Sequence, residues 1–352
     1  MPNSKWTRVI LLWLVAAVAG QAQEHPKVEL SNGVLRATIY LPDATTGFYR
    51  GTRFDWAGMF ASLEYKGHNY FGPFYEKFDP AIADVVVADP IVAGTNSAAS
   101  GPVEEFMSPD GSSLGYSDAK PGQPFYKIGV GVLEKPMEEH YSSFQHYTVL
   151  SPGQRSVEKG KDWIEFSQRA DGGPEHSYIY RKMIRFEKTK PVMILEHSLE
   201  NTGRKSIDTE VYDHNFLSID RQTVGPRILL TFAFPPKATA SMEGFAEIRG
   251  NQIAFLKPLQ GSDILYTPIE GMSDNAKDYN FRVENRETGA GVWITGDRPM
   301  TKFALWAVRT VVAPEPFIRV KVEPGQVYRW SYKYEFYETT RVVGRTTADQ
   351  TQ

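Results

Sequence analysis

The sequence predicts an all-β protein of large, packed antiparallel sheets with few or no helices. Aromatic residues make up 13% of the 352 residues, and the chain also carries 29 Gly and 23 Pro. Aromatic and β-branched runs interrupted by glycine and proline are typical of many strands joined by turns. Apolar residues recur at every second position in several segments, whereas amphipathic helical periodicity is scarce. Layered sheets are how such a chain buries its apolar faces.

The chain begins with MPNSKWTRVILLWLVAAVAGQAQ, a segment typical of a secretory signal. A positively charged start precedes an apolar run over residues 9–19, and residues 20–22, Gly-Gln-Ala, offer small side chains where a signal peptidase cleaves. We expect residues 1–22 to be a signal peptide that is cleaved after Ala22, and the protein to be secreted or periplasmic. An uncleaved membrane anchor is the alternative.

The composition excludes several classes of protein. The chain contains no cysteine, so thiolate catalysis, disulfides and cysteine zinc sites are not available to it. Its net charge of −3 argues against a nucleic-acid-binding protein, which would carry a basic balance. No second apolar stretch reaches the roughly 18 residues that suggest a membrane-spanning helix. We therefore expect neither nucleic acid nor, after signal cleavage, a membrane as partner.

Three segments carry the clearest strand pattern. Successive side chains of a strand point to opposite faces, so sustained alternation predicts a strand. The segments are VLRATIYL at 34–41, VMILEHSL at 192–199 and YRWSYKYEF at 328–336. The aromatic stripe of the last segment has the form of a sugar-binding platform, but we interpret it as core.

The remaining organisation is less regular. Residues 79–90, DPAIADVVVADP, are ambiguous, and we interpret them as a strand. Residues 94–124 are rich in Gly, Ser, Pro and Asp, which predicts a long loop that is functional or mobile. No repeat or linker divides the chain. We expect one β domain over 23–340 and a polar tail over 341–352.

The seven histidines give no metal-binding spacing. None are placed as HxH, HxxxH or HExxH, so no metal site is predicted. His197 lies on the apolar face of its strand, and we interpret it as a core histidine. His68 stands in KGHNYFG, a predicted hairpin turn, where it would face the surface or a pocket.

His214 is the most suggestive of these histidines. It stands between Tyr212 and Phe216 in TEVYDHNFLSID, and alternation places all three side chains on one face of a strand. A partly apolar setting can hold a histidine pKa near neutrality, and aromatic rings pack on the CH-rich faces of sugars. From these residues alone, a general acid and a buried histidine with one backbone partner are equal alternatives.

Glu315 is bracketed by Pro314 and Pro316 in APEPFI. Proline biases the preceding residue to extended geometry and removes a ladder donor, which predicts a strand edge, end or bulge. A carboxylate held in this way suits a catalytic base. An exposed edge charge that blocks aggregation is the alternative.

The segment GFYRGTRFDWAGMF, residues 47–60, groups charged and aromatic side chains. Arg53 can donate paired hydrogen bonds to sugar hydroxyls or to a uronate carboxylate, and Trp56 offers a stacking face. The alternative is an ion pair between Arg53 and Asp55 on a strand surface. Lys127 interrupts the apolar strand FYKIGVGVL and is a further candidate for binding substrate.

Four segments, in this order, resemble the galactose mutarotase-like superfamily, which includes aldose 1-epimerases. They are SNGVLRATIYLPDA, PVMILEHSLENTG, EVYDHNFLSID and VAPEPFIRVKVEPGQVYRWSYKYEFYE. In that family an N-x-G-like turn precedes the strand with the acid histidine, a glutamate follows much later, and a PGE-like turn leads into an aromatic strand ending in Y-x-F. These features map to residues 201–203, His214, Glu315, residues 324–326 and residues 334–336.

The resemblance spans about residues 27–338 and implies a β-supersandwich fold. It also implies a mutarotase-like isomerase, with His214 as the acid that protonates the ring oxygen and Glu315 as the base for the anomeric hydroxyl. No cofactor or metal is implied. The N-x-L-H-G-G-like segment that supplies a second histidine in typical aldose epimerases is absent, which leaves the sugar open. His68, His140 and His146 are the alternatives for that second histidine, and the pattern does not choose between them.

The expected partner is a mono- or oligosaccharide, and the oligomeric state is open. The candidate substrate-binding residues are Arg53, Asp55, Trp56, His68, Lys127, Tyr212, Phe216 and Trp306. Two other functions fit the same scaffold. A non-catalytic carbohydrate-binding protein would not need the pair of His214 and Glu315. A polysaccharide lyase or hydrolase acting on uronates would need a Tyr or His base, with a cation or Arg near the carboxylate.

Overall fold

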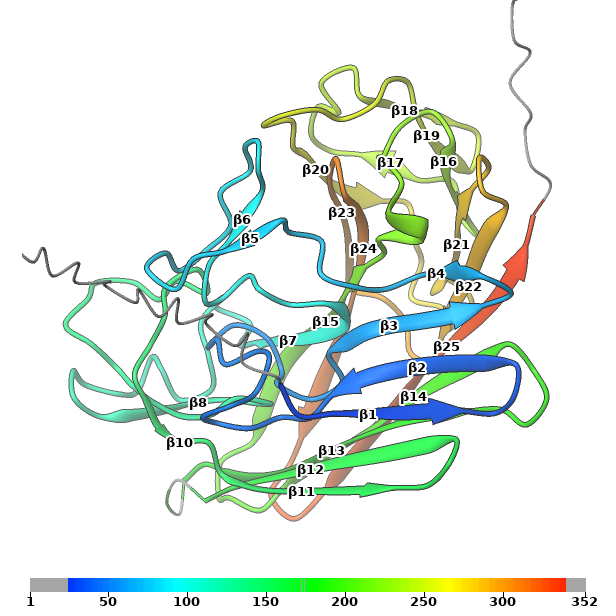
Figure 1. Ribbon diagram of the computed structural model, residues 1–352. Coiled ribbons are helices and arrows are strands. Elements are labelled where there is room, and N and C mark those ends of the chain that lie inside the picture. The colour runs from blue at the N-terminus through cyan, green and yellow to red at the C-terminus, as the bar shows by residue number, and fades with distance from the viewer. Residues whose placement is uncertain (1–24, 172, 174, 340–352) are drawn as a thin grey trace, which may run out of the picture.

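Nearly all the regular structure is antiparallel β-sheet (Figure 1). The structure is a computed structural model that describes residues 25–171, 173 and 175–339. Within these residues the helical segments are two short 3-10 turns, η1 (Ile219–Arg221) and η2 (Ala276–Asp278). The predicted all-β class is confirmed. The expected signal peptide (1–22) and polar tail (341–352) lie outside the described residues.

The largest sheet has ten antiparallel strands. Its spatial order is β11 (Gln154–Lys159), β12 (Trp163–Asp171), β13 (Ser177–Phe186), β14 (Val192–Asn201), β25 (Val327–Glu338), β22 (Ala290–Gly296), β21 (Asn280–Asn285), β16 (Ile228–Phe232), β19 (Gln252–Phe255) and β18 (Ala246–Arg249). Strand β25 places Trp330, Tyr332, Tyr334 and Phe336 in the main core. The C-terminal aromatic stripe is therefore core, as predicted.

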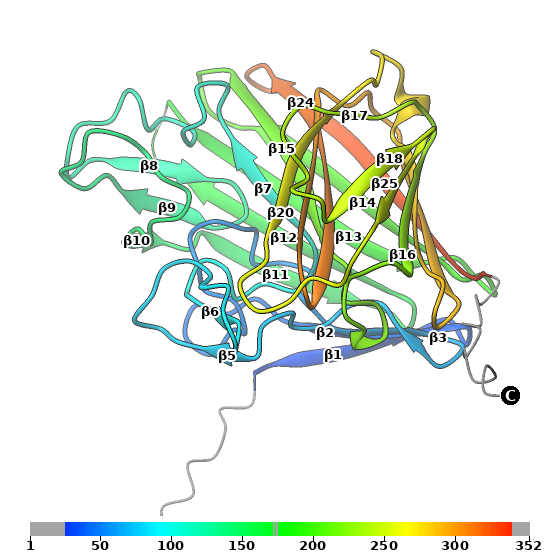
Figure 2. The ribbon, with the colours of Figure 1, turned by 90° about the horizontal axis from the view of Figure 1, so that it is seen from above.

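The second sheet has six antiparallel strands and packs against the first (Figure 2). Its order is β17 (Lys237–Ala238), β20 (Leu265–Glu270), β23 (Lys302–Val308), β24 (Val311–Val322), β15 (Ile207–Phe216) and β7 (Gly101–Met107). Val211 and Ile318 of this sheet share one core cluster with Leu195 and Tyr332 of the larger sheet. The two apolar faces thus bury each other, which is the packing expected of layered sheets.

Three smaller sheets complete the fold. They are β1 (Lys27–Ser31), β2 (Leu35–Tyr40), β3 (Phe60–Tyr65) and β4 (His68–Asn69); β8 (Pro124–Lys127), β9 (Gly131–Glu134) and β10 (Val149–Ser151); and the parallel pair β5 (Lys77–Phe78) and β6 (Val92–Ala93). In both views β5, β6, β8 and β10 gather at one end of the molecule, and β16 to β18 lie at the other (Figures 1 and 2). Within the described residues, no helix is long and apolar enough to cross a membrane.

Strand β15 separates two cores. Val211 and Leu217 point into the main core between the sheets, whereas Tyr212 and Phe216 belong to a second, aromatic-rich cluster on the opposite face. The predicted alternation in TEVYDHNFLSID is therefore confirmed. The face that carries Tyr212, His214 and Phe216 is covered by loops rather than by another large sheet, which leaves room there for a cavity.

Two predictions for the first third of the chain were wrong. Residues 79–90 form turns, and within them only Val86 makes an isolated bridge. Residues 94–124, predicted as a loop, contain strand β7. Its two adjacent glutamates, Glu104 and Glu105, concealed it, because a buried strand rarely carries charges. Both carboxylates are paired with buried cations in the folded protein.

Candidate active site

Strands β15 and β24 lie side by side, and their backbone pairing is interrupted at His214 and Glu315. The paired register stops two residues short of each of them. Pro314 and Pro316 have no N–H to donate, and Asn215 Nδ2 instead donates to the carbonyl oxygen of Pro314 (3.0 Å). The interruption predicted from the prolines is real, but it lies in an interior strand and not at a sheet edge.

At this interruption of the strand pairing, His214 and Glu315 are in direct contact. His214 Nε2 lies 3.1 Å from Glu315 Oε1, and the two residues are 4% and 7% exposed. The imidazole stacks on Phe216 with ring centroids 3.8 Å apart. Phe54 and Trp306 meet it edge-on, at 5.6 and 5.7 Å between centroids. His214 and Glu315 are thus almost fully buried, and aromatic rings surround the imidazole.

Burial keeps both members of the pair uncharged. Desolvation lowers the pKa of His214 well below its usual value, and the positive charge of Arg53 is the second, smaller cause. Desolvation raises the pKa of Glu315 to about 8, although Arg53 opposes the rise. When Nε2 accepts, the neutral imidazole carries its hydrogen on Nδ1, which has no hydrogen-bond partner among the described residues. Near neutral pH the proton therefore resides on the Glu315 carboxyl, which donates to Nε2.

The pair opens into a cavity of about 500 Å³. Six residues singled out from the sequence line it: Arg53, Tyr212, His214, Phe216, Trp306 and Glu315. Other lining residues were not anticipated: Phe54, Phe74, Asp84, Val85, Ser97, Glu105, Met107, Ser143, Phe144, Ile264, Tyr266 and Phe317. Most of these are aromatic or aliphatic, so the cavity has apolar walls with a few convergent polar groups, as small-molecule sites usually do.

Arg53 is held in place from several sides. Its Nε donates to Glu105 Oε2 (2.8 Å) and one terminal nitrogen donates to the Tyr212 hydroxyl (3.1 Å). The guanidinium also lies over the rings of Phe54 and Phe144, 4.6 and 4.8 Å from their centroids. Its carboxylate partners are thus Glu105 and, at 3.9 Å, Asp84, and the alternative pairing with Asp55 on a strand surface is not present.

Lys127 stands behind the cavity and does not line it. The side chain is fully buried, and Nζ donates to Glu105 Oε1 (3.1 Å), to the Phe106 carbonyl oxygen (2.8 Å) and to the Tyr141 hydroxyl (3.2 Å). Lys127 and Arg53 together lower the pKa of Glu105 against the opposing effect of its burial. Lys127 can therefore reach a ligand only through Glu105.

Three other sequence candidates lie elsewhere. Asp55 is buried beneath the site, where desolvation raises its pKa to about 7. Trp56 lines a separate cavity. His68 begins β4 in the predicted hairpin, and its Nδ1 contacts Asp220 Oδ2 (2.9 Å) in a different surface hollow. His197, interpreted as a core histidine, is buried against Glu104.

Some of the missed lining residues carried a signal in the sequence. Phe317 lies two positions after Glu315, so strand alternation alone would have placed it on the same face. Glu105 was hidden in the stretch predicted as a loop. Ile264 and Tyr266 are exposed rim residues, 43% and 55%, which no local pattern distinguishes from ordinary surface. Within the described residues no group of three or more His, Asp or Glu is placed to hold a metal ion.

Comparison with solved structures identifies the fold. A GalM/aldose epimerase homologue from Caenorhabditis elegans aligns over 90% of this chain and 100% of its own, with 14% identity and a TM-score of 0.51. A galactose mutarotase-like protein from Clostridium acetobutylicum aligns over 90% and 96%, with 10% identity and a TM-score of 0.52. A protein from Synechocystis sp. PCC 6803 aligns over 90% and 97%, with 10% identity and a TM-score of 0.52.

By sequence, no family model and no curated protein matches the chain. The chain has the galactose mutarotase-like fold, so the fold implied by the four quoted segments is confirmed. At these identities the likeness concerns the fold, and a fold of this kind hosts more than one function. Any activity must be argued from the cavity itself.

Proposed function

We propose that this protein is an aldose 1-epimerase-like isomerase, a mutarotase that interconverts sugar anomers by acid–base ring opening. The observation that carries the proposal is the contact between His214 Nε2 and Glu315 Oε1, inside a cavity of about 500 Å³ with aromatic walls. A pair of titratable groups whose pKa values are pushed in opposite directions is a frequent mark of acid–base catalysis.

Mutarotation requires a proton donor for the ring oxygen and a proton acceptor for the anomeric hydroxyl. Both oxygens are bonded to the anomeric carbon, so a donor and an acceptor that touch each other can serve both. The protonated Glu315 donates to the ring oxygen, and neutral His214 takes the hydroxyl proton. The bond from the anomeric carbon to the ring oxygen breaks and the hydroxyl becomes a carbonyl. The pair is left as carboxylate and imidazolium.

Reclosure reverses these transfers after the aldehyde has rotated. Imidazolium returns a proton to the carbonyl oxygen, and the carboxylate takes the proton of the ring hydroxyl as it attacks. The starting roles are thus opposite to those implied by the family resemblance, which made His214 the acid. Because opening and closing exchange the roles, either assignment completes the cycle. Each positioned group typically contributes about 10²–10⁴-fold.

The walls supply binding and exclusion of water. Phe74, Trp306 and Phe317 present apolar surfaces that suit the CH faces of a pyranose. Arg53 holds the Tyr212 hydroxyl and Glu105 in fixed positions and sets the local field at Glu315.

We further propose, from the N-terminal segment alone, that the protein acts after export as a secreted or periplasmic protein.

Polarimetry tests the proposal directly. Freshly dissolved α-anomers of glucose, galactose, rhamnose and glucuronate are followed with the wild type, His214→Ala and Glu315→Gln. We expect acceleration for at least one sugar and its loss in both variants. His68→Ala is the matched control, because this histidine lies in a different hollow. Acceleration that survives Glu315→Gln would refute the proposed acid. No acceleration of any sugar would leave a carbohydrate-binding protein as the better description.

A further inference from the structure

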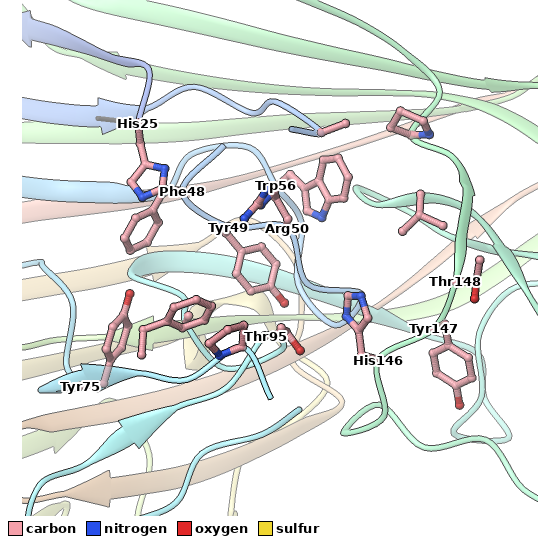
Figure 3. A pocket seen from close by; sticks show the side chains of 16 residues that line it. His25, Phe48, Tyr49, Arg50, Trp56, Tyr75, Thr95, His146, Tyr147 and Thr148 are labelled. Atoms are coloured by element: carbon pink, nitrogen blue, oxygen red, sulfur yellow. The ribbon is translucent and has the colours of Figure 1, made fainter. Parts of the chain in front are cut away.

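A second cavity, of about 690 Å³, is lined by the side chains that Figure 3 shows. Residues 49–54, 95–98 and 143–149 each supply side chains to both cavities, so these three segments form a shared wall. The second cavity contains none of the residues that line the first, and neither His214 nor Glu315 reaches it.

Asn96 holds the shared wall together from a fully buried position. Its backbone oxygen accepts from the Tyr49 hydroxyl (3.0 Å) and its Oδ1 accepts from the Thr52 N–H (2.8 Å). Its Nδ2 donates to the carbonyl oxygen of Gln145 (2.8 Å). One side chain thus joins all three segments, and the second cavity is a built feature of the fold.

Aromatic and polar side chains alternate around this cavity. In Figure 3, His25, Phe48 and Tyr75 lie on one side, His146, Tyr147 and Thr148 on the other, and Tyr49, Arg50 and Trp56 between them. Phe78 also lines the cavity, and half of its side chain is exposed. Aromatic faces beside hydrogen-bonding groups are what a sugar ring requires, since its two faces are apolar and its rim is polar.

The two histidines are set up as hydrogen-bond acceptors. His146 Nδ1 lies 3.3 Å from Asn96 Oδ1, and His25 Nδ1 lies 2.9 Å from the Thr46 carbonyl oxygen. Both neighbours can only accept, so Nδ1 carries the hydrogen in each ring and Nε2 of the neutral ring is an acceptor. Burial lowers the pKa of His146, which favours its neutral form. Both Nε2 atoms can thus accept from ligand hydroxyls.

The charge of this cavity differs from that of the first. Its lining contains no Asp or Glu, although the chain has 42 of them, and it contains Arg50. In the part of the chain that the structure describes, the hydrogen bond of Arg50 is to the Thr45 carbonyl oxygen, which leaves its positive charge without a carboxylate. The first cavity, in contrast, has three carboxyl groups, on Asp84, Glu105 and Glu315, beside one arginine.

We propose that the second cavity binds a sugar residue that carries a carboxylate, such as a uronic acid residue of a glycan. The carboxylate pairs with Arg50, ring hydroxyls donate to Nε2 of His25 and His146, and an apolar face of the ring packs on Phe78. This site is distinct from the proposed isomerase site and requires no catalysis.

Calorimetric titration with methyl α-D-galacturonoside tests the proposal, with methyl α-D-galactoside as the neutral counterpart. A methyl glycoside cannot undergo ring-opening mutarotation, so the heat reports binding alone. We expect the galacturonoside to bind the wild type, and the galactoside to bind at least about tenfold more weakly, because a charge-assisted pair is lost. Equal affinity for the two ligands would overturn the assigned carboxylate specificity.

Variants locate the binding site. Arg50→Gln should weaken galacturonoside binding about tenfold. Phe78→Ala should weaken it without any change in charge. Arg50 is exposed and Phe78 is 50% exposed, so folding should be unaffected. Glu315→Gln should bind as the wild type does. Binding that is lost in Glu315→Gln but retained in Arg50→Gln would place the ligand in the first cavity, and no binding at all would also overturn the proposal.

The readouts separate this inference from the proposed isomerase. Arg50→Gln should leave mutarotation unchanged in polarimetry, because Arg50 lies on the far side of the shared wall. If no sugar is accelerated but the galacturonoside still binds through Arg50, the isomerase proposal fails and the second site stands. If mutarotation occurs without galacturonoside binding, the isomerase proposal stands and the proposed second site fails.

Discussion

Lys182 Nζ lies 2.5 Å from Glu104 Oε2, and both side chains are fully buried. Lys182 stands on β13 of the ten-stranded sheet and Glu104 on β7 of the six-stranded sheet. His197 Nε2, 2.7 Å from Glu104 Oε1, completes the cluster. Burial alone would raise the pKa of Glu104, but Lys182 and then His197 outweigh it and lower that pKa to about 2. An ion pair therefore joins the two sheets behind the candidate active site.

Removing one partner of this pair should destabilise the fold strongly. Lys182→Met leaves the buried Glu104 carboxylate with His197 as its remaining partner, and removing one member of a buried ion pair reduces the free energy of unfolding by about 3–5 kcal/mol. Urea denaturation followed by tryptophan fluorescence measures the effect. Arg169→Met, which breaks the exposed pair with Asp171, is the control and should change little. A change in Lys182→Met as small as in this control would show that the buried pair contributes no net stability.

The sequence predicted the strands better than their partners. Alternation placed Tyr212, His214 and Phe216 on one face of β15, because side-chain direction within a strand is a local property. The contact between His214 and Glu315 depends on β15 and β24 being neighbours, although about 100 residues separate them along the chain. Strand pairing at that separation is set by the whole fold, so only the family resemblance suggested that these two residues act together.

The sequence failed where the backbone is irregular or where charge is buried. Residues 48–59 form no strand, so nearness along the chain to Arg53 did not bring Asp55 and Trp56 to the same cavity. Glu105 was missed because a charged pair of residues does not look like a buried strand. Its partners Arg53 and Lys127 come from distant segments, so no local sequence pattern predicts these ion pairs.

Export can be tested on the secreted or periplasmic fraction. If residues 1–22 are a signal peptide, the mature protein should begin at Gln23. Expression of the full-length chain in a bacterium with a general secretion pathway, followed by intact-mass measurement of the exported protein, gives the cleavage position. Replacing Leu11 and Leu12 with Asp should retain the protein in the cell at full length. A full-length exported protein, or cytoplasmic protein only, would contradict cleavage after Ala22.

The pH dependence of mutarotation should reveal the proton on Glu315. This carboxyl must be protonated to act as the acid, and its pKa is raised to about 8, so the rate should fall as the pH rises through about 8. The rate should stay level at pH 6, because the lowered pKa of His214 keeps the imidazole neutral there. Initial rates of optical rotation from pH 5 to pH 10 give the profile. A rate that rises with pH through this range would contradict an acidic Glu315.

Arg53 should shift this profile through its charge. Its guanidinium lowers the pKa of Glu315 and also that of His214, so removing the charge should raise both. In Arg53→Met the alkaline limb should therefore move to higher pH and the acidic limb should move up with it. Arg53→Lys keeps the charge and should leave both limbs close to those of the wild type, even if the rate falls because Glu105 and Tyr212 lose their fixed partner. Limbs that stay in place in Arg53→Met would mean that burial alone sets the two pKa values, and that Arg53 serves only to position its neighbours.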